Sequence, residues 1–154
     1  MLNKDKSSIR SILAPGNILL LFMIFSLFAV SCKKEIKAGP PIALTYDQVY
    51  MVGNATSVGW DINNAIPMTP TSGNADEFTW EGPLYAGEIK FPTALSWTSD
   101  TFMSATAGQS VTDNKALLAL NGNPDYHWAL ADADAGNYKI TLNTKDQTVT
   151  FQKE

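Results

Sequence analysis

Residue types on which much protein chemistry depends are scarce in this sequence. Among 154 residues there is one cysteine, Cys32, and one histidine, His127. A single cysteine excludes an intramolecular disulfide. Charged residues make up only 17% of the chain and the formal net charge is −4, which argues against nucleic-acid binding because that function needs a basic patch or stripe. Long helical periodicity is also missing, and turn residues are frequent, so the composition indicates β structure.

The one long apolar run lies near the N-terminus, at residues 18–30. Its 13 residues are too few to span a bilayer as a helix, which takes about 20. Lys4, Lys6 and Arg10 precede the run, and small residues follow it. A basic segment, a short apolar stretch and small residues together predict a signal peptide over residues 1–31, which is excluded from the fold.

The end of this segment, Ala-Val-Ser-Cys at residues 29–32, resembles a bacterial lipobox. The resemblance implies cleavage before Cys32, lipid attachment to its sulfur and an outer-membrane lipid anchor. A signal anchor with an unmodified thiol is the competing interpretation. The position of the only cysteine, directly after the apolar run, favours the lipoprotein.

A short tether follows at residues 32–43, stiffened by Pro40 and Pro41. The charges of Lys33, Lys34 and Glu35 match a surface-export signal only in part, so surface display is an expectation. The signal segment carries three basic residues and one acidic residue, which leaves the mature part with a net charge of −6. An acidic body disfavours binding to an anionic membrane, so the lipid would act alone as the anchor.

The remaining residues, 44–154, read as one domain of short strands separated by turns. Alternating segments at 77–81, 137–143 and 147–152 predict strands, and the last two predict a C-terminal hairpin. Shorter apolar segments at 49–52, 65–69, 88–91 and 126–130 predict further strands. Residues 92–110 read as a long connection, and residues 111–120 fit a helix or a strand equally. About seven short strands over some 110 residues fit an antiparallel β-sandwich.

No catalytic signature accompanies these strands. His127 stands in a predicted strand without a serine or cysteine motif, so we assign it a structural or solvent-facing role. Asp125, Asp132 and Asp134 lie in turns, whose chemistry explains them without calcium, because no terminal bidentate Glu follows as in a calcium loop. A carboxylate pair for glycoside hydrolysis is not favoured in so small a domain with so few acidic residues in its strands. We therefore expect a non-enzymatic protein that needs no cofactor and no metal.

Four tryptophans divide into two kinds. Trp80 and Trp128 lie in strand patterns, where core packing is the expected role. Trp60 and Trp97 lie among Gly, Ser, Thr, Asp and Asn, where an indole either packs inside its loop or forms an exposed platform. Between these two tryptophans in the sequence lies Lys90, with a long cationic side chain. Two flat aromatic faces and one cationic donor suit a ligand that has an apolar face and an edge of hydroxyls. Such a ligand is a sugar.

Several segments together resemble the C-terminal carbohydrate-binding domains of SusE/SusF-type outer-membrane starch-binding lipoproteins. They are Val-Tyr-Met-Val-Gly-Asn-Ala (49–55), Gly-Trp-Asp (59–61), Ala-Gly-Glu-Ile-Lys-Phe (86–91) and Gly-Asn-Tyr-Lys-Ile-Thr-Leu (136–142). The similarity as a whole covers residues 46–154. The resemblance implies an immunoglobulin-like β-sandwich that binds starch-type α-glucans (maltooligosaccharides) at the cell surface without cleaving them. It also implies that other proteins of a glycan-uptake system are partners.

The resemblance assigns roles to individual residues. Trp60 and Trp97 stand where the family has its two sugar-stacking aromatics, and Lys90 stands where it has a cation that donates to hydroxyls. Asn121 is the candidate for a polar partner from a later loop. One departure is that family members usually carry an N-terminal domain and two or more binding modules, whereas this sequence shows one. The alternative function is a structural or protein-interaction module of an outer-membrane complex, with both indoles buried in loop packing.

Overall fold

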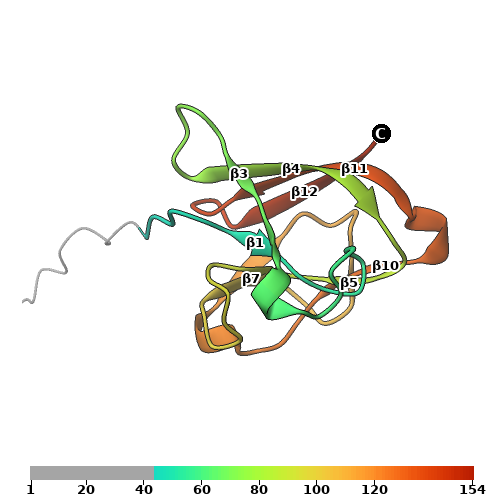
Figure 1. The fold of residues 1–154 in the computed structure, drawn as a ribbon, viewed down its shortest axis with the longest axis horizontal. Coiled ribbons are helices and arrows are strands. Elements are labelled where there is room, and N and C mark those ends of the chain that lie inside the picture. The colour runs from blue at the N-terminus through green and yellow to red at the C-terminus, as the bar shows by residue number, and fades with distance from the viewer. Residues whose placement is uncertain (1–43) are drawn as a thin grey trace, which may run out of the picture. The chain divides into compact units, whose positions relative to one another are not determined.

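The computed structural model describes residues 44–154; the signal peptide, Cys32 and the tether lie outside the described residues. Between residues 44 and 154 the chain forms strands and three short 3₁₀ turns (Figure 1). In chain order the elements are β1 (Tyr50–Met51), η2 (Ile62–Asn64), β2 (Ile66–Pro67), β3 (Thr69–Pro70), β4 (Glu77–Leu84), β5 (Gly87–Ile89), β6 (Phe91–Pro92), β7 (Thr101–Ser104), β8 (Gln109–Ser110), β9 (Ala116–Ala119), η3 (Leu120–Gly122), β10 (Trp128–Leu130), η4 (Asp132–Asp134), β11 (Gly136–Asn143) and β12 (Thr148–Lys153).

One layer is a four-stranded antiparallel sheet in the order β12-β11-β4-β3. Its strands β4 and β11 are the longest in the domain and pair over their full eight residues. Alternation along β11 sends Tyr138, Ile140 and Leu142 to the buried face and leaves the residues between them partly exposed. This period of two is what a sheet with one buried face requires.

The other layer is built from short pieces: the pair β1-β2 and the three-stranded sheets β5-β10-β8 and β6-β7-β9. An isolated bridge between Val52 and Lys90 joins the segments of β1, β5 and β6. In this layer β10 pairs antiparallel with β5 and parallel with β8. The two layers lie one above the other in Figure 1, with β4, β11 and β12 in the upper part and β1, β5, β7 and β10 in the lower part.

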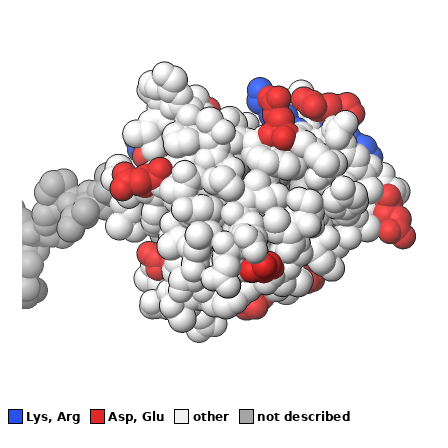
Figure 2. Space-filling model, in the orientation of Figure 1, with Lys and Arg blue, Asp and Glu red and all other residues white. Residues whose placement is uncertain are grey.

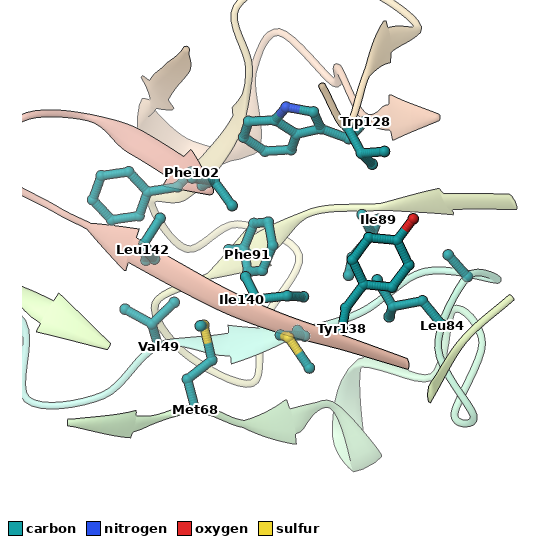
Figure 3. Close-up of a cluster of buried hydrophobic side chains, with 14 of the residues drawn as sticks. Val49, Met68, Leu84, Ile89, Phe91, Phe102, Trp128, Tyr138, Ile140 and Leu142 are labelled. Atoms are coloured by element: carbon teal, nitrogen blue, oxygen red, sulfur yellow. The ribbon is translucent and has the colours of Figure 1, made fainter. Parts of the chain in front are cut away.

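The hydrophobic core fills the space between the layers (Figure 3). The largest contribution comes from aromatic side chains, because Phe91, Phe102 and Trp128 are fully buried. The rings of Phe91 and Trp128 meet edge to face, with centroids 5.6 Å apart. Fully burying a side chain of this size is worth about 2–3 kcal/mol. Buried side chains thus anchor strands β5, β6 and β10 in the core.

These observations confirm the predicted β-sandwich and the C-terminal hairpin, which is β11 and β12. The prediction of a long connection over residues 92–110 was wrong, because it contains β7 and β8. All four residues of β7 are buried, so this strand shows no alternation by which the sequence could reveal it. The segment that fitted a helix or a strand equally contains strand β9.

Among residues 44–154, no helix is long and apolar enough to cross a membrane. Figure 2 shows a surface on which Asp and Glu side chains lie at several separate places around the domain, with the few visible Lys and Arg side chains at its edges. The acidic charge of the domain is therefore spread out on this face, not gathered into one patch.

Candidate functional site

Trp60 lies on a tight turn that its neighbours fix. Gly59 adopts a left-handed conformation, with φ of 60°, and its carbonyl accepts a hydrogen bond of 2.8 Å from Gly53 N. After the tryptophan, Asp61 caps the short turn η2 by accepting from Asn63 N at 3.1 Å. Ile62 is buried and anchors this turn against the domain. The loop is thereby tied down on both sides of Trp60, whose side chain stays 38% exposed.

Lys90 is placed by strand alternation. Its neighbours Ile89 and Phe91 are fully buried in the core, so Lys90 points to the opposite face of the layer. Both of its backbone groups pair with Val52, at 3.0 and 3.1 Å. The Lys90 side chain is nevertheless only 8% exposed, because the two loop tryptophans lie over it.

Trp97 is carried by a loop that closes on itself. The loop is pinned at its base, where Thr93 N and Thr93 Oγ1 both donate to Asp100 O, at 2.9 and 2.8 Å. Within the loop, Ser99 Oγ donates to Ser96 O at 2.8 Å. The backbone of Gly122 packs against the Trp97 carbonyl so closely that an added Cβ would lie 2.6 Å from the oxygen. The indole itself is 46% exposed.

The three side chains meet in one open hollow of about 360 Å³. The indoles of Trp60 and Trp97 have centroids 6.4 Å apart and are inclined to one another by 46°. Lys90 Nζ lies 5.5 Å from the ring centroid of Trp60 and 4.9 Å from that of Trp97. Both distances are in the range of attraction between a cation and an aromatic face. The arrangement is a bent aromatic surface with one ammonium group at its base.

Three further side chains line the hollow, and the sequence interpretation did not place them there: Glu88, Asp125 and His127. The ring of His127 meets that of Trp60 edge to face, with centroids 5.0 Å apart. Its Nε2 lies 3.2 Å from Asp125 Oδ1, and its Nδ1 lies 3.7 Å from Glu88 Oε2. His127 thus joins the aromatic surface to an acidic edge.

One of these three residues, His127, had a signal in the sequence, which was strand alternation. Trp128 and Leu130 point into the core, so His127 must point away from it. The pairing of β10 with β5 sets Trp128 opposite Ile89, and the residues next to these two, His127 and Lys90, both line the hollow. One sequence does not reveal which strands pair, so the proximity of His127 to Lys90 could not be predicted from it.

Lys90 and Asp125 form an ion pair, with Nζ 2.5 Å from Oδ1. Partial burial raises the pKa of Asp125, but the hydrogen bond and charge of Lys90, with those of His127, lower that pKa by more, and the net shift is downward. A carboxyl with a depressed pKa stabilises the folded state above the ordinary Asp pKa of about 3.9, and this contribution is lost as the pH falls through the depressed value. The contribution is small because the Asp125 side chain is 63% exposed.

The structure does not bring the fourth predicted residue, Asn121, to the lining of the hollow. Asn121 lies in η3 with a φ of 53°, and its backbone N donates to Asp100 Oδ1 at 3.2 Å, beside the base of the Trp97 loop. Its role in ligand binding stays a prediction. In the described part of the chain, no group of three or more His, Cys, Asp or Glu side chains is placed to hold a metal ion.

The other two tryptophans differ from the pair at the hollow. Trp128 is fully buried, and its indole N–H donates to Asp113 O at 3.1 Å. Trp80 is half-buried, packs on the edge of the core and lies across Gly82. The sequence division into two strand tryptophans and two loop tryptophans therefore matches their surroundings.

Comparison with known proteins agrees with this architecture. The crystal structure of SusF from Bacteroides thetaiotaomicron matches with a TM-score of 0.54 at 22% sequence identity, over 74% of this chain and 25% of that chain. The match shows a shared fold, and this chain corresponds to about a quarter of the length of SusF. No curated protein sequence matches significantly. The family described as SusF/SusE starch specific CBMs matches residues 48–150, and the chain therefore belongs to the SusF/SusE family of carbohydrate-binding modules.

Proposed function

We propose that this domain binds starch-type α-glucans, without cleaving them, in the hollow formed by Trp60, Lys90 and Trp97. The observation that carries the proposal is the exposure of two indoles, 38% and 46%, on the same side of the domain over one ammonium group. Indoles buried within their own loops would favour the alternative, an interaction module without a sugar site. Membership of a family described as starch specific is consistent with the proposal.

The inclination of the two rings suits the shape of the ligand. Sugar rings present apolar C–H faces that stack on an indole, and successive glucose units of an α-1,4 chain turn relative to one another. Two indoles inclined by 46° can each meet one unit of such a curved chain. A flat β-1,4 chain would need two coplanar platforms. The geometry thus favours an α-glucan over a cellulose-like glycan.

The expected affinity is low. If each ring covers roughly 60–80 Å² of sugar, two rings supply about 3–4 kcal/mol at 25 cal/mol/Å². A hydrogen bond from Lys90 adds about 1 kcal/mol. After the cost of association, the dissociation constant falls in the millimolar to high-micromolar range, where 1 mM corresponds to about −4 kcal/mol. Such a site works through avidity, when many anchored copies hold one polymer.

A pull-down on insoluble starch tests the proposal. The parent domain should sediment with starch, and the double variant Trp60→Ala/Trp97→Ala should stay in the supernatant. Tyr85→Ala is a matched control, because Tyr85 is 50% exposed but does not line the hollow. Failure of the parent to bind starch, or equal binding by the double variant, would contradict the proposal.

We propose further that the protein is attached through a lipid on Cys32 to the outer membrane and faces the cell exterior, where it supports capture and uptake of the glucan with partner proteins. Cys32 is the only cysteine, at the end of a signal-like segment. Labelled palmitate should enter the parent and not Cys32→Ala. Protease added to intact cells should remove the domain if it is displayed outside, and a domain that survives until the cells are lysed would contradict surface display.

A further inference from the structure

The only histidine of the chain, His127, lies in the wall of the hollow between two carboxylates. Its Nε2 lies 3.2 Å from Asp125 Oδ1, and its Nδ1 lies 3.7 Å from Glu88 Oε2. The two acidic residues come from different segments, since Glu88 belongs to β5 and Asp125 precedes β10. Each ring nitrogen of His127 therefore faces a carboxylate oxygen.

The charge of the imidazole decides how many of these contacts are attractive. A neutral imidazole carries a hydrogen on one ring nitrogen and a lone pair on the other, whereas the protonated ring donates from both nitrogens. Whichever nitrogen of neutral His127 carries the hydrogen, the other turns its lone pair to a carboxylate. Neutral His127 can therefore hold one of Glu88 and Asp125, and protonated His127 can hold both.

His127 also supports one of the two indoles. Its ring meets that of Trp60 edge to face, with centroids 5.0 Å apart and planes inclined by 64°. Because Trp60 stands on a different loop and is 38% exposed, the imidazole is a neighbour that limits the tilt of the indole. A cation this close to an aromatic ring is attracted to it. A protonated His127, held by both carboxylates, should thus fix Trp60 more firmly than the neutral ring does.

One positive charge opposes this effect. Lys90 Nζ shares Oδ1 of Asp125 with His127 and so lies near the imidazole. Its repulsion of a protonated ring is countered by the two carboxylates that face the ring nitrogens. The carboxylates of the two tryptophan loops, Asp61 and Asp100, accept hydrogen bonds from residues of nearby turns, and strand β8, which pairs with β10, carries no charge. The negative charges around His127 therefore outnumber the positive one.

We propose that His127 is a positioning residue for Trp60 and that its protonation strengthens glucan binding as the pH falls from about 8 to about 5.5. The inference rests on the proposed function and adds control of that site by pH. Histidine is the side chain whose charge ordinarily changes in this range. Ordinary carboxyl groups stay ionised across it, and lysines stay protonated. An indole that is fixed before the ligand arrives loses less conformational freedom on binding, so the affinity rises.

The test is calorimetric titration of the parent and of His127→Phe with maltoheptaose at about pH 5.5 and about pH 8. The parent should bind about two- to fivefold more tightly at the lower pH, the effect of one cation beside an exposed aromatic ring. His127→Phe keeps an aromatic ring beside Trp60 but cannot gain a proton, so its dissociation constant should be the same at both pH values. Asp132→Asn, which changes an exposed residue outside the hollow, should keep the pH dependence of the parent.

A second measurement needs no ligand. Nuclear magnetic resonance follows the ring signals of His127 and the indole N–H signal of Trp60 over the same pH range. The signals of the two residues should move together with one midpoint. In His127→Phe the Trp60 signal should not move.

The outcomes separate the two proposals. A parent that binds maltoheptaose equally at both pH values, or a pH dependence that persists in His127→Phe, overturns the role of His127 and leaves glucan binding intact. A Trp60 signal that does not follow the titration of His127 overturns that role as well. A parent that binds at neither pH, together with a negative starch pull-down, overturns the proposed function and the control by pH with it. Circular dichroism of each variant establishes that a changed affinity reflects the site and not the fold.

Discussion

Replacement of Trp97 by alanine gives the sharpest quantitative prediction. The indole is 46% exposed, and its loop is held by hydrogen bonds that do not involve the ring, such as those from Thr93 to Asp100 O. Trp97→Ala removes the contact between the indole and Lys90 Nζ at 4.9 Å, so the free energy of unfolding should fall by about 1–2 kcal/mol while the backbone of the loop keeps its hydrogen bonds. The variant should stay folded, so that its effect on the ligand can be measured.

The size of that effect follows from the area of the ring face. A face that covers roughly 60 Å² of sugar contributes about 1.5 kcal/mol at 25 cal/mol/Å². A loss of 1.4 kcal/mol is tenfold in the dissociation constant, so Trp97→Ala should weaken glucan binding about tenfold. Trp97→Phe keeps part of the face, so we expect a loss of only about threefold.

Affinity electrophoresis in gels that contain soluble starch measures these ratios directly. The parent should be retarded strongly, Trp97→Phe less, and Trp97→Ala least, while Tyr85→Ala migrates as the parent does because Tyr85 lies outside the hollow. Equal retardation of the parent and a folded Trp97→Ala would refute the stacking argument. So would an equal loss in Tyr85→Ala, because that would place the glucan elsewhere.

Three further predictions follow from the surroundings of the hollow. Lys90→Met removes the ammonium while keeping the chain length, and titration with maltoheptaose should show about fivefold weaker binding, in line with one hydrogen bond of about 1 kcal/mol. Glu88→Gln removes a negative charge from the lining of the hollow, which should favour an anionic ligand. The affinity for C6-oxidised, anionic maltodextrin, relative to that for neutral maltodextrin, should rise about two- to fivefold at low salt and less at high salt. An unchanged ratio of the two affinities would contradict this prediction. Gly53→Ala would place a Cβ 2.0 Å from Glu88 O at a φ of 143°, and urea unfolding should show a loss of at least about 2 kcal/mol. Gly73→Ala, with a φ of 80° and no neighbour within 4 Å, should cost only about 1 kcal/mol.

The parts of the fold that the sequence predicted best are those with one buried face. Strands β4, β11 and β12 were predicted from the period of their sequence patterns, and the pairing of β11 with β12 was predicted from the short turn between them. Strand β7 is buried at every position and gave no such signal. The segment around Lys90 read as one strand but forms β5 and β6 with a bridge at Lys90 between them, because its pairing partner changes there from β10 to Val52 and then to β7.

The candidate site was predictable in part for a similar reason. Trp60, Lys90 and Trp97 stand out as residue types that suit a sugar, and the structure brings all three together. His127 and Asp125 look unremarkable in sequence, since their place in the hollow depends on which strand β10 pairs with. Asn121 was predicted as a ligand-binding residue because it lies at the start of a turn. In the structure this turn packs at the base of the Trp97 loop, where the backbone N of Asn121 donates to Asp100 Oδ1.

The most direct test of the central claim is a nuclear magnetic resonance titration that follows the indole N–H signals of the four tryptophans while maltoheptaose is added. We expect the signals of Trp60 and Trp97 to shift together with one dissociation constant in the millimolar to high-micromolar range. The signal of Trp128, whose indole is buried and bonded to Asp113 O, should not move, and neither should that of Trp80. Four unmoved signals at saturating millimolar glucan, or shifts confined to Trp80 and Trp128, would contradict glucan binding by Trp60 and Trp97.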